Sequence, residues 1–128
     1  MTLLEALVVV AITALVGALE FPNLERALAM FSLRETASAL TADLREARAD
    51  ALREDQDVTF AFTPDGRGYI WSEGQARTLP QVVSVQQGVT IRFFADGSAS
   101  GGAIKLASGK RVVPISVDSA TGAVTAGS

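Results

Sequence analysis

The order of apolar and polar residues divides the chain into a helical N-terminal part and a strand-rich C-terminal part. From Met1 to Leu19 the only ionisable side chain is Glu5. About 20 helical residues, each rising about 1.5 Å, cross a bilayer core of about 30 Å, so the pattern predicts a membrane-spanning helix over residues 1–21. A carboxylate in such a segment costs roughly 2.5 to 3.5 kcal/mol, and intramembrane acids usually face a partner at a working site.

Beyond this segment, apolar residues recur every three or four positions, as on the buried face of an amphipathic helix. We predict one long helix over residues 2–53, with residues 22–54 as its amphipathic part. We expect Pro22 to kink or locally break it, because proline lacks an N–H and its ring clashes with the preceding turn. We expect the apolar stripe to pack on the sheet, with its upstream end free for partner helices. The stripe comprises Leu24, Leu28, Phe31, Leu33, Ala37, Leu40, Leu44, Ala47 and Ala51.

The other face of the helix carries charges of both signs, and we expect it to be solvated. Asp50 and Arg53 are spaced to interact across one helical turn. The charged positions are Arg26, Arg34, Glu35, Asp43, Arg45, Glu46, Arg48, Asp50, Arg53 and Glu54.

After Asp57 the apolar period shortens to about 2 residues and turn signals become frequent, which indicates short strands. Asp65-Gly66 predicts a hairpin turn because both residue types tolerate positive φ, and Thr121-Gly122 predicts another turn. Residues 96–102 are too small and flexible to pack as a strand and are predicted to form a loop. The predicted strands cover residues 57–63, 68–72, 82–86, 89–95, 102–107, 111–118 and 122–126.

The strand-rich part, residues 55–128, has few aromatic residues and is too small to enclose a core by itself. We therefore expect an α+β fold in which the long helix packs on a small antiparallel β-sheet or β-sandwich. A chain of 128 residues with a membrane segment leaves room for one small globular domain.

Composition narrows the chemistry that this domain can perform. The formal net charge of -3 provides no basic footprint for nucleic acid, so a nucleic-acid partner is disfavoured. The chain has no cysteine and no histidine, which excludes disulfides, thiolate sites and the commonest general base. Asp65, Asp96 and Asp118 are too scattered for a calcium loop. We expect no enzymatic activity, no cofactor and no metal site.

The apolar start also lacks the basic residues that precede a cleaved secretory signal.

The opening sequence Thr2-Leu3-Leu4-Glu5 resembles the N-terminal signature of mature type IV pilins and type II secretion pseudopilins. Met1 stands where that family has an N-methylated Phe, so it marks the processing and methylation position. Further along the chain, residues 93–106, 113–117 and 121–124 resemble the C-terminal half of GspH/FimT-like minor pseudopilins.

This resemblance implies a pilin-like fold and a non-catalytic structural subunit at or near the tip of a type II secretion pseudopilus, which supports export of folded proteins. It implies a single-pass protein of the bacterial inner membrane with its C-terminal domain in the periplasm. The implied partners are other pseudopilins, the inner-membrane assembly platform and, as further candidates, exported proteins or the outer-membrane secretin. The carboxylate at the position of Glu5 is thought to pair with the terminal amine of a neighbouring subunit.

Alternatives remain for both candidate sites. Glu5 could instead be an acid favoured by the dipole at a helix N-terminus, with its carboxylate snorkelling to the interface. The loop could be a plain flexible hairpin, or it could bind an anion or contact a partner. The loop residues concerned are Asp96, Gly97, Ser98, Ser100, Gly101 and Gly102.

The rival function is that of a FimT-like minor pilin of a type IV pilus, involved in pilus assembly or DNA uptake. DNA-binding members of that family carry a C-terminal Gly-Arg-x-Arg type of motif. Residues 121–128 contain no arginine, although Arg92, Lys105, Lys110 and Arg111 could gather on one face.

Overall fold

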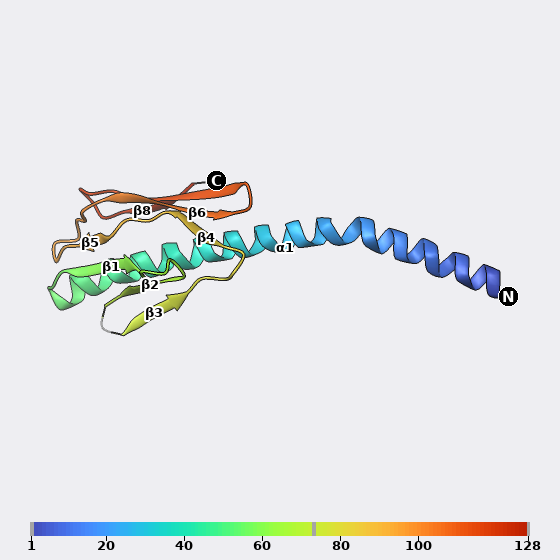
Figure 1. Ribbon diagram of the computed structural model, residues 1–128. Coiled ribbons are helices and arrows are strands. Elements are labelled where there is room, and N and C mark those ends of the chain that lie inside the picture. The colour runs from blue at the N-terminus through green and yellow to red at the C-terminus, as the bar shows by residue number, and fades with distance from the viewer. Residues whose placement is uncertain (1, 73, 128) are drawn as a thin grey trace.

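A single long helix, α1 (Leu3–Glu54), forms the axis of the protein. The computed structural model describes residues 2–72 and 74–127, with the backbone alone at positions 20 and 21. The two β-sheets surround the C-terminal half of α1, and the N-terminal half extends away from them (Figure 1). Among the described residues, α1 contains the one stretch long and apolar enough to cross a membrane, and this stretch packs against nothing else in the chain.

The ends of α1 carry the local signals that start and stop helices. Thr2 is the N-cap, with extended backbone, and its side chain accepts a hydrogen bond from the Glu5 N–H. Asp55 closes the helix in the left-handed conformation and its N–H donates to the Ala51 carbonyl. The helix continues through Pro22, so the expected local break does not occur there. Figure 1 shows an arched helix axis, and a kink at Pro22 itself stays a prediction.

The strands form two antiparallel four-stranded sheets. The first has the order β3-β2-β1-β5 and the second the order β4-β6-β7-β8. Along the chain the strands are β1 (Val58–Phe62), β2 (Gly68–Trp71), β3 (Gln75–Thr78), β4 (Ser84–Gln87), β5 (Ile91–Phe93), β6 (Gly102–Ser108), β7 (Arg111–Val117) and β8 (Val124–Ala126).

Each predicted strand is present, with ends that differ by at most two residues, but β3 was not predicted. All four residues of β3 are exposed, so the strand has no apolar alternation to detect. It is held as an edge strand by backbone pairing with β2, from Gly68 opposite Thr78 to Trp71 opposite Gln75. The turns at Asp65-Gly66 and Thr121-Gly122 are confirmed, since both glycines have positive φ between paired strands.

The core lies between α1 and the two sheets, as the small size of the strand-rich part predicted. Leu40, Leu44 and Ala47 are fully buried on the helix side. Phe60 and Tyr69 face these helix residues from the first sheet, and the centroids of the two rings are 4.9 Å apart. The buried part of the stripe begins at Leu33, whereas three upstream apolar residues are exposed, namely Leu24, Leu28 and Phe31.

The expectation of a fully solvated charged face on α1 is wrong. Asp43 and Asp50 are buried, at 4% and 8% exposure, because side chains from the first sheet reach them. Asp43 accepts hydrogen bonds from Tyr69 and Arg77, and Asp50 accepts one from the Ser72 hydroxyl. The predicted pair of Asp50 with Arg53 is present. The charged face of the helix therefore helps to attach the sheets.

Candidate functional site

The first candidate site is the N-terminal turn of α1 around Glu5. The Glu5 N–H donates to Thr2 Oγ1 at 3.2 Å, and the Thr2 N–H donates to Glu5 Oε2 at 3.4 Å. This reciprocal pair is a capping box, which satisfies two of the N–H groups left free at a helix start. None of the ion pairs among the described residues involves Glu5. The carboxylate therefore caps its own helix and has no cationic partner in this part of the chain.

The surface around Glu5 is apolar and exposed. Leu3 is 90% exposed, and Leu4, Val8 and Val9 form with Glu5 a shallow hollow of about 410 Å³. A contiguous apolar surface of this kind marks contact with a membrane or another protein. Met1, the expected processing and methylation position, lies outside the described residues.

A second exposed stretch of α1 lies between Pro22 and the globular domain. Leu24, Leu28 and Phe31 continue the apolar stripe, and Phe31 is 65% exposed. These residues lie outside the core cluster, whose first helical member is Leu33. This stretch therefore remains available to partner helices, as the sequence pattern suggests.

The predicted loop at residues 96–102 is held by hydrogen bonds, some within the loop and some from residues outside it. Asp96 Oδ1 accepts from the N–H and the hydroxyl of Ser98, at 2.9 and 2.6 Å. These bonds to the charged form hold the pKa of the Asp96 carboxyl below its ordinary value. The Ser100 hydroxyl accepts a hydrogen bond from the Arg92 N–H, and Arg48 Nε donates to the Gly97 carbonyl.

The glycines of this loop pack against the rest of the domain. Gly97 has a φ of 94° and is buried beside the Arg48 guanidinium. Gly101 and Gly102 also have positive φ and lie against Ser119 and Val89 respectively. The loop residues exposed for contact with another molecule are Asp96, Ser100 and Gly102.

Metal-binding side chains do not gather in the part of the chain that the structure describes. No group of three His, Cys, Asp or Glu residues is placed to hold an ion there. The Asp65 and Asp96 carboxylates each accept hydrogen bonds within their own turns.

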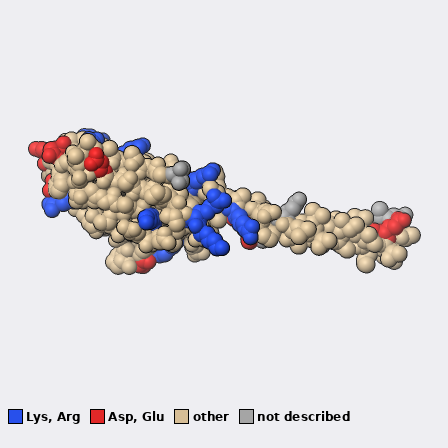
Figure 2. Space-filling model, turned by 90° about the horizontal axis from the view of Figure 1, so that it is seen from above, with Lys and Arg blue, Asp and Glu red and all other residues tan. Residues whose placement is uncertain are grey.

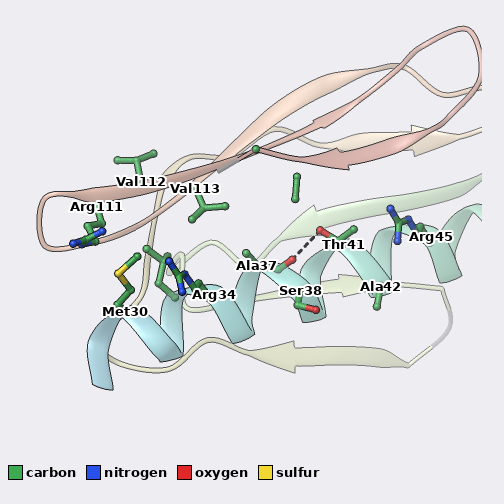
Figure 3. A pocket seen from close by; sticks show the side chains of 13 residues that line it. Met30, Arg34, Ala37, Ser38, Thr41, Ala42, Arg45, Arg111, Val112 and Val113 are labelled. Atoms are coloured by element: carbon green, nitrogen blue, oxygen red, sulfur yellow. Dashed lines mark hydrogen bonds between the residues drawn. The ribbon is translucent and has the colours of Figure 1, made fainter. Parts of the chain in front are cut away.

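The structure also reveals a groove that the sequence did not predict, between α1 and the second sheet (Figure 3). It has a volume of about 630 Å³. Met30 and Ala37 line it from the helix, and Val113 from β7. Arg34 on α1 and Arg111 on β7 add positive charge to its wall, as Figure 3 shows. The groove forms because β8 pairs with β7 only from Ile115 onward, which leaves the first half of β7 uncovered.

Comparisons with known proteins agree on one family. Residues 36–122 match the sequence model described as Type II transport protein GspH. The chain is 34% identical over 116 residues to the type II secretion system protein H of Xanthomonas campestris pv. campestris, a match that covers 82% of this chain and 69% of that protein.

Two similar solved structures support the fold. The type IV minor pilin FimU of Pseudomonas aeruginosa superposes with a TM-score of 0.65 at 13% identity, covering 75% of this chain and 88% of FimU. The minor pseudopilin EpsH of the Vibrio cholerae type 2 secretion system gives 0.63 at 12% identity, covering 76% of this chain and 97% of EpsH. At these identities the similarity shows the fold alone, and it confirms the expected pilin-like α+β architecture.

Proposed function

The chain belongs to the GspH family of type II transport proteins, and we propose that it is a minor pseudopilin at or near the tip of a type II secretion pseudopilus. In this role it is a non-catalytic structural subunit that supports export of folded proteins across the outer membrane. The match of residues 36–122 with the GspH family is the observation that carries the proposal. The exposed apolar half of α1 supports it, because a fibre subunit needs a helix that packs on other helices.

The proposed location follows from the same helix. Before assembly the N-terminal segment anchors the subunit in the inner membrane, and the globular domain lies in the periplasm. During assembly the apolar surface exchanges lipid for the helices of neighbouring pseudopilins, with the help of the inner-membrane assembly platform. Exported proteins and the outer-membrane secretin are further candidate partners.

Glu5 is proposed to direct this exchange. In its capping box the carboxylate accepts one hydrogen bond, from the Thr2 N–H, and none of the ion pairs among the described residues involves it, so its charge stays poorly compensated in lipid. A neighbouring terminal amine would supply the missing charge in a medium of low dielectric constant, where opposite charges attract strongly. The pair would set the axial register of the subunit and favour its extraction from the membrane.

A secretion assay separates the charge of Glu5 from its capping role. In a strain that lacks the gene, we expect exoprotein to accumulate in the periplasm and the wild-type gene to restore secretion. Glu5→Gln keeps the hydrogen-bonding side chain of the capping box and removes the charge. We expect it to restore little or no secretion.

Two variants serve as controls for this assay. Thr2→Ala removes the cap at a cost of about 1 kcal/mol and keeps the charge, and Glu25→Gln makes the same chemical change on an exposed part of the helix. We expect both to restore secretion. Full rescue by Glu5→Gln would contradict the charge-pair role. Normal secretion in the deletion strain would instead favour the alternative of a FimT-like minor pilin in type IV pilus assembly or DNA uptake.

A further inference from the structure

Four basic side chains gather where the globular domain meets the exposed part of α1. Arg26 and Arg34 come from the helix, Lys110 comes from the turn between β6 and β7, and Arg111 is the first residue of β7. We call these four residues the basic collar. Figure 2 shows basic side chains concentrated at this junction. All four are exposed, and none takes part in an ion pair or a side-chain hydrogen bond among the described residues. The collar therefore carries uncompensated positive charge on a chain whose net charge is -3.

The collar surrounds a hollow with room for a small anionic group. This hollow has a volume of about 600 Å³, and Arg26, Lys110 and Arg111 line it. Ala27 and Gly109 occupy other parts of its wall, so small side chains leave space between the cations. Arg111 also lines the groove of Figure 3. Arg34 lines the same groove, so it lies in the same region as the other three cations. Among the described residues, no Asp or Glu side chain lines either cavity. Convergent cations around a cavity create a local field that attracts anions.

The Arg26 end of the collar lies close to the expected headgroup layer of a membrane, and Arg34 lies about 12 Å farther along α1. At about 1.5 Å per residue, Arg26 lies about 10 Å beyond Leu19, where the uncharged apolar segment ends. The headgroup layer on each side of the hydrocarbon core is about 5 to 8 Å thick, and long basic side chains reach back into it. The turn that carries Lys110 lies beside Arg26 and Ala29, so it adds its charge at nearly the same height.

We propose that the basic collar binds the phosphates of anionic phospholipid headgroups while the subunit is anchored in the membrane. The proposal rests on the membrane-anchored state in the proposed function. Such binding would hold the globular domain against the bilayer surface and would have to be released when the subunit enters a fibre. Each basic residue near an anionic surface strengthens binding about five-fold. A long polyanion such as DNA fits less well, because the whole chain carries a net charge of -3.

Lipid retention by the full chain tests this proposal directly. The protein is purified in detergent micelles that contain equal amounts of phosphatidylglycerol and phosphatidylcholine with matched acyl chains. Native mass spectrometry then counts the lipids that stay bound to the wild type and to two charge-matched variants. Lys110→Gln/Arg111→Gln removes two charges from the collar. Arg92→Gln/Lys105→Gln removes two exposed charges elsewhere, where Arg92 pairs with Asp57.

We expect the wild type and Arg92→Gln/Lys105→Gln to retain phosphatidylglycerol in preference to phosphatidylcholine. The collar variant should lose that preference by about twenty-five-fold, since two cations worth about five-fold each are removed. Equal retention of both lipids by the wild type would overturn the proposal, and so would an equal loss in both variants. Displacement of the retained lipid by inorganic phosphate would assign the collar to a free anion, and displacement by short duplex DNA would assign it to nucleic acid. Because this assay involves no secretion, its result is independent of the Glu5 experiment.

Discussion

At the scale of single residues, Asp43 connects the helix to the edge of the first sheet. The Tyr69 hydroxyl and Arg77 Nε both donate to Asp43 Oδ2 at 2.6 Å. Burial, and then the hydrogen bond to Asp43, raise the pKa of Tyr69 far above its ordinary value, so the hydroxyl remains a donor at all physiological pH values. Because β3 buries none of its own side chains, the bond from Arg77 to Asp43 is its main side-chain attachment to the helix.

Removal of the Asp43 carboxylate should destabilise the domain. Asp43→Ala leaves the Tyr69 hydroxyl buried without an acceptor, and we expect the free energy of unfolding to fall by about 3 kcal/mol. Tyr69→Phe removes a single hydrogen bond to a charged group and should cost about 1.5 kcal/mol. Trp71 fluorescence during chemical denaturation of the full chain in detergent measures both changes. Glu46→Ala, at an exposed acid on the same helix, should cost less than about 0.5 kcal/mol. Equal stability of the Asp43→Ala and Glu46→Ala proteins would contradict this account.

At the scale of secondary-structure elements, Arg48 on α1 joins two turns of the domain. Its Nε donates to the Gly97 carbonyl at 3.0 Å and to the Thr121 carbonyl at 3.2 Å. The turn between β7 and β8 fits closely here because Gly122 has a φ of 70° and no side chain. A Cβ at this position would lie 2.2 Å from the Gly97 carbonyl oxygen, inside any normal contact distance.

Two glycine substitutions separate backbone strain from packing at these turns. Gly66 has nearly the same φ as Gly122, at 71°, but open space around it. Gly66→Ala should therefore lower the free energy of unfolding by about 1 kcal/mol, which is the strain of the left-handed conformation alone. Gly122→Ala should cost about 1 to 3 kcal/mol more, because the added methyl group forces the Gly97 carbonyl away. Hydrogen exchange at residues 97 and 122 should rise in Gly122→Ala alone. Equal destabilisation by the two substitutions would show that the close contact does not matter.

At the scale of the whole molecule, the protein consists of a packed part and an exposed part on one helix. The core begins at Leu33, and upstream of it no described apolar residue is fully buried. The globular domain therefore owes none of its packing to the N-terminal segment, which is left entirely for lipid or other subunits. This division predicts that a change at Glu5 leaves the fold of the globular domain intact.

Deletion of residues 2–24 tests this division. We expect the shortened protein to be soluble without detergent and to unfold cooperatively at the melting temperature of the full chain, within a few degrees. The reason is that none of the deleted residues whose side chains the structure describes belongs to the core. Circular dichroism of both proteins during heating measures the difference. Loss of a cooperative transition would show that the exposed helix contributes to the stability of the domain.

The sequence alone determined the order and type of almost every element, because each is specified by local physics. The apolar run predicted the exposed segment, the three-to-four spacing predicted α1, and the alternation predicted every strand except β3. The motif around Glu5 indicated the superfamily of pilins and pseudopilins, and the resemblance of residues 93–106, 113–117 and 121–124 predicted the GspH family. The spacing of Asp50 and Arg53 was enough to predict their pair, which depends only on helical geometry.

Tertiary structure decided what depends on residues far apart in the chain. The sequence pattern indicated a solvated face on α1, and Asp43 and Asp50 belong to that face. Both are buried because side chains distant in the sequence contact them. Tyr69 and Arg77 bind Asp43, and Ser72 binds Asp50. β3 forms because its backbone pairs with the free edge of β2. The pattern of apolar and polar side chains does not indicate such pairing. The basic collar forms because a hairpin turn returns to the helix near Arg26. Periodicity reports which face of an element is apolar, but the partner of a charged residue is set by the fold.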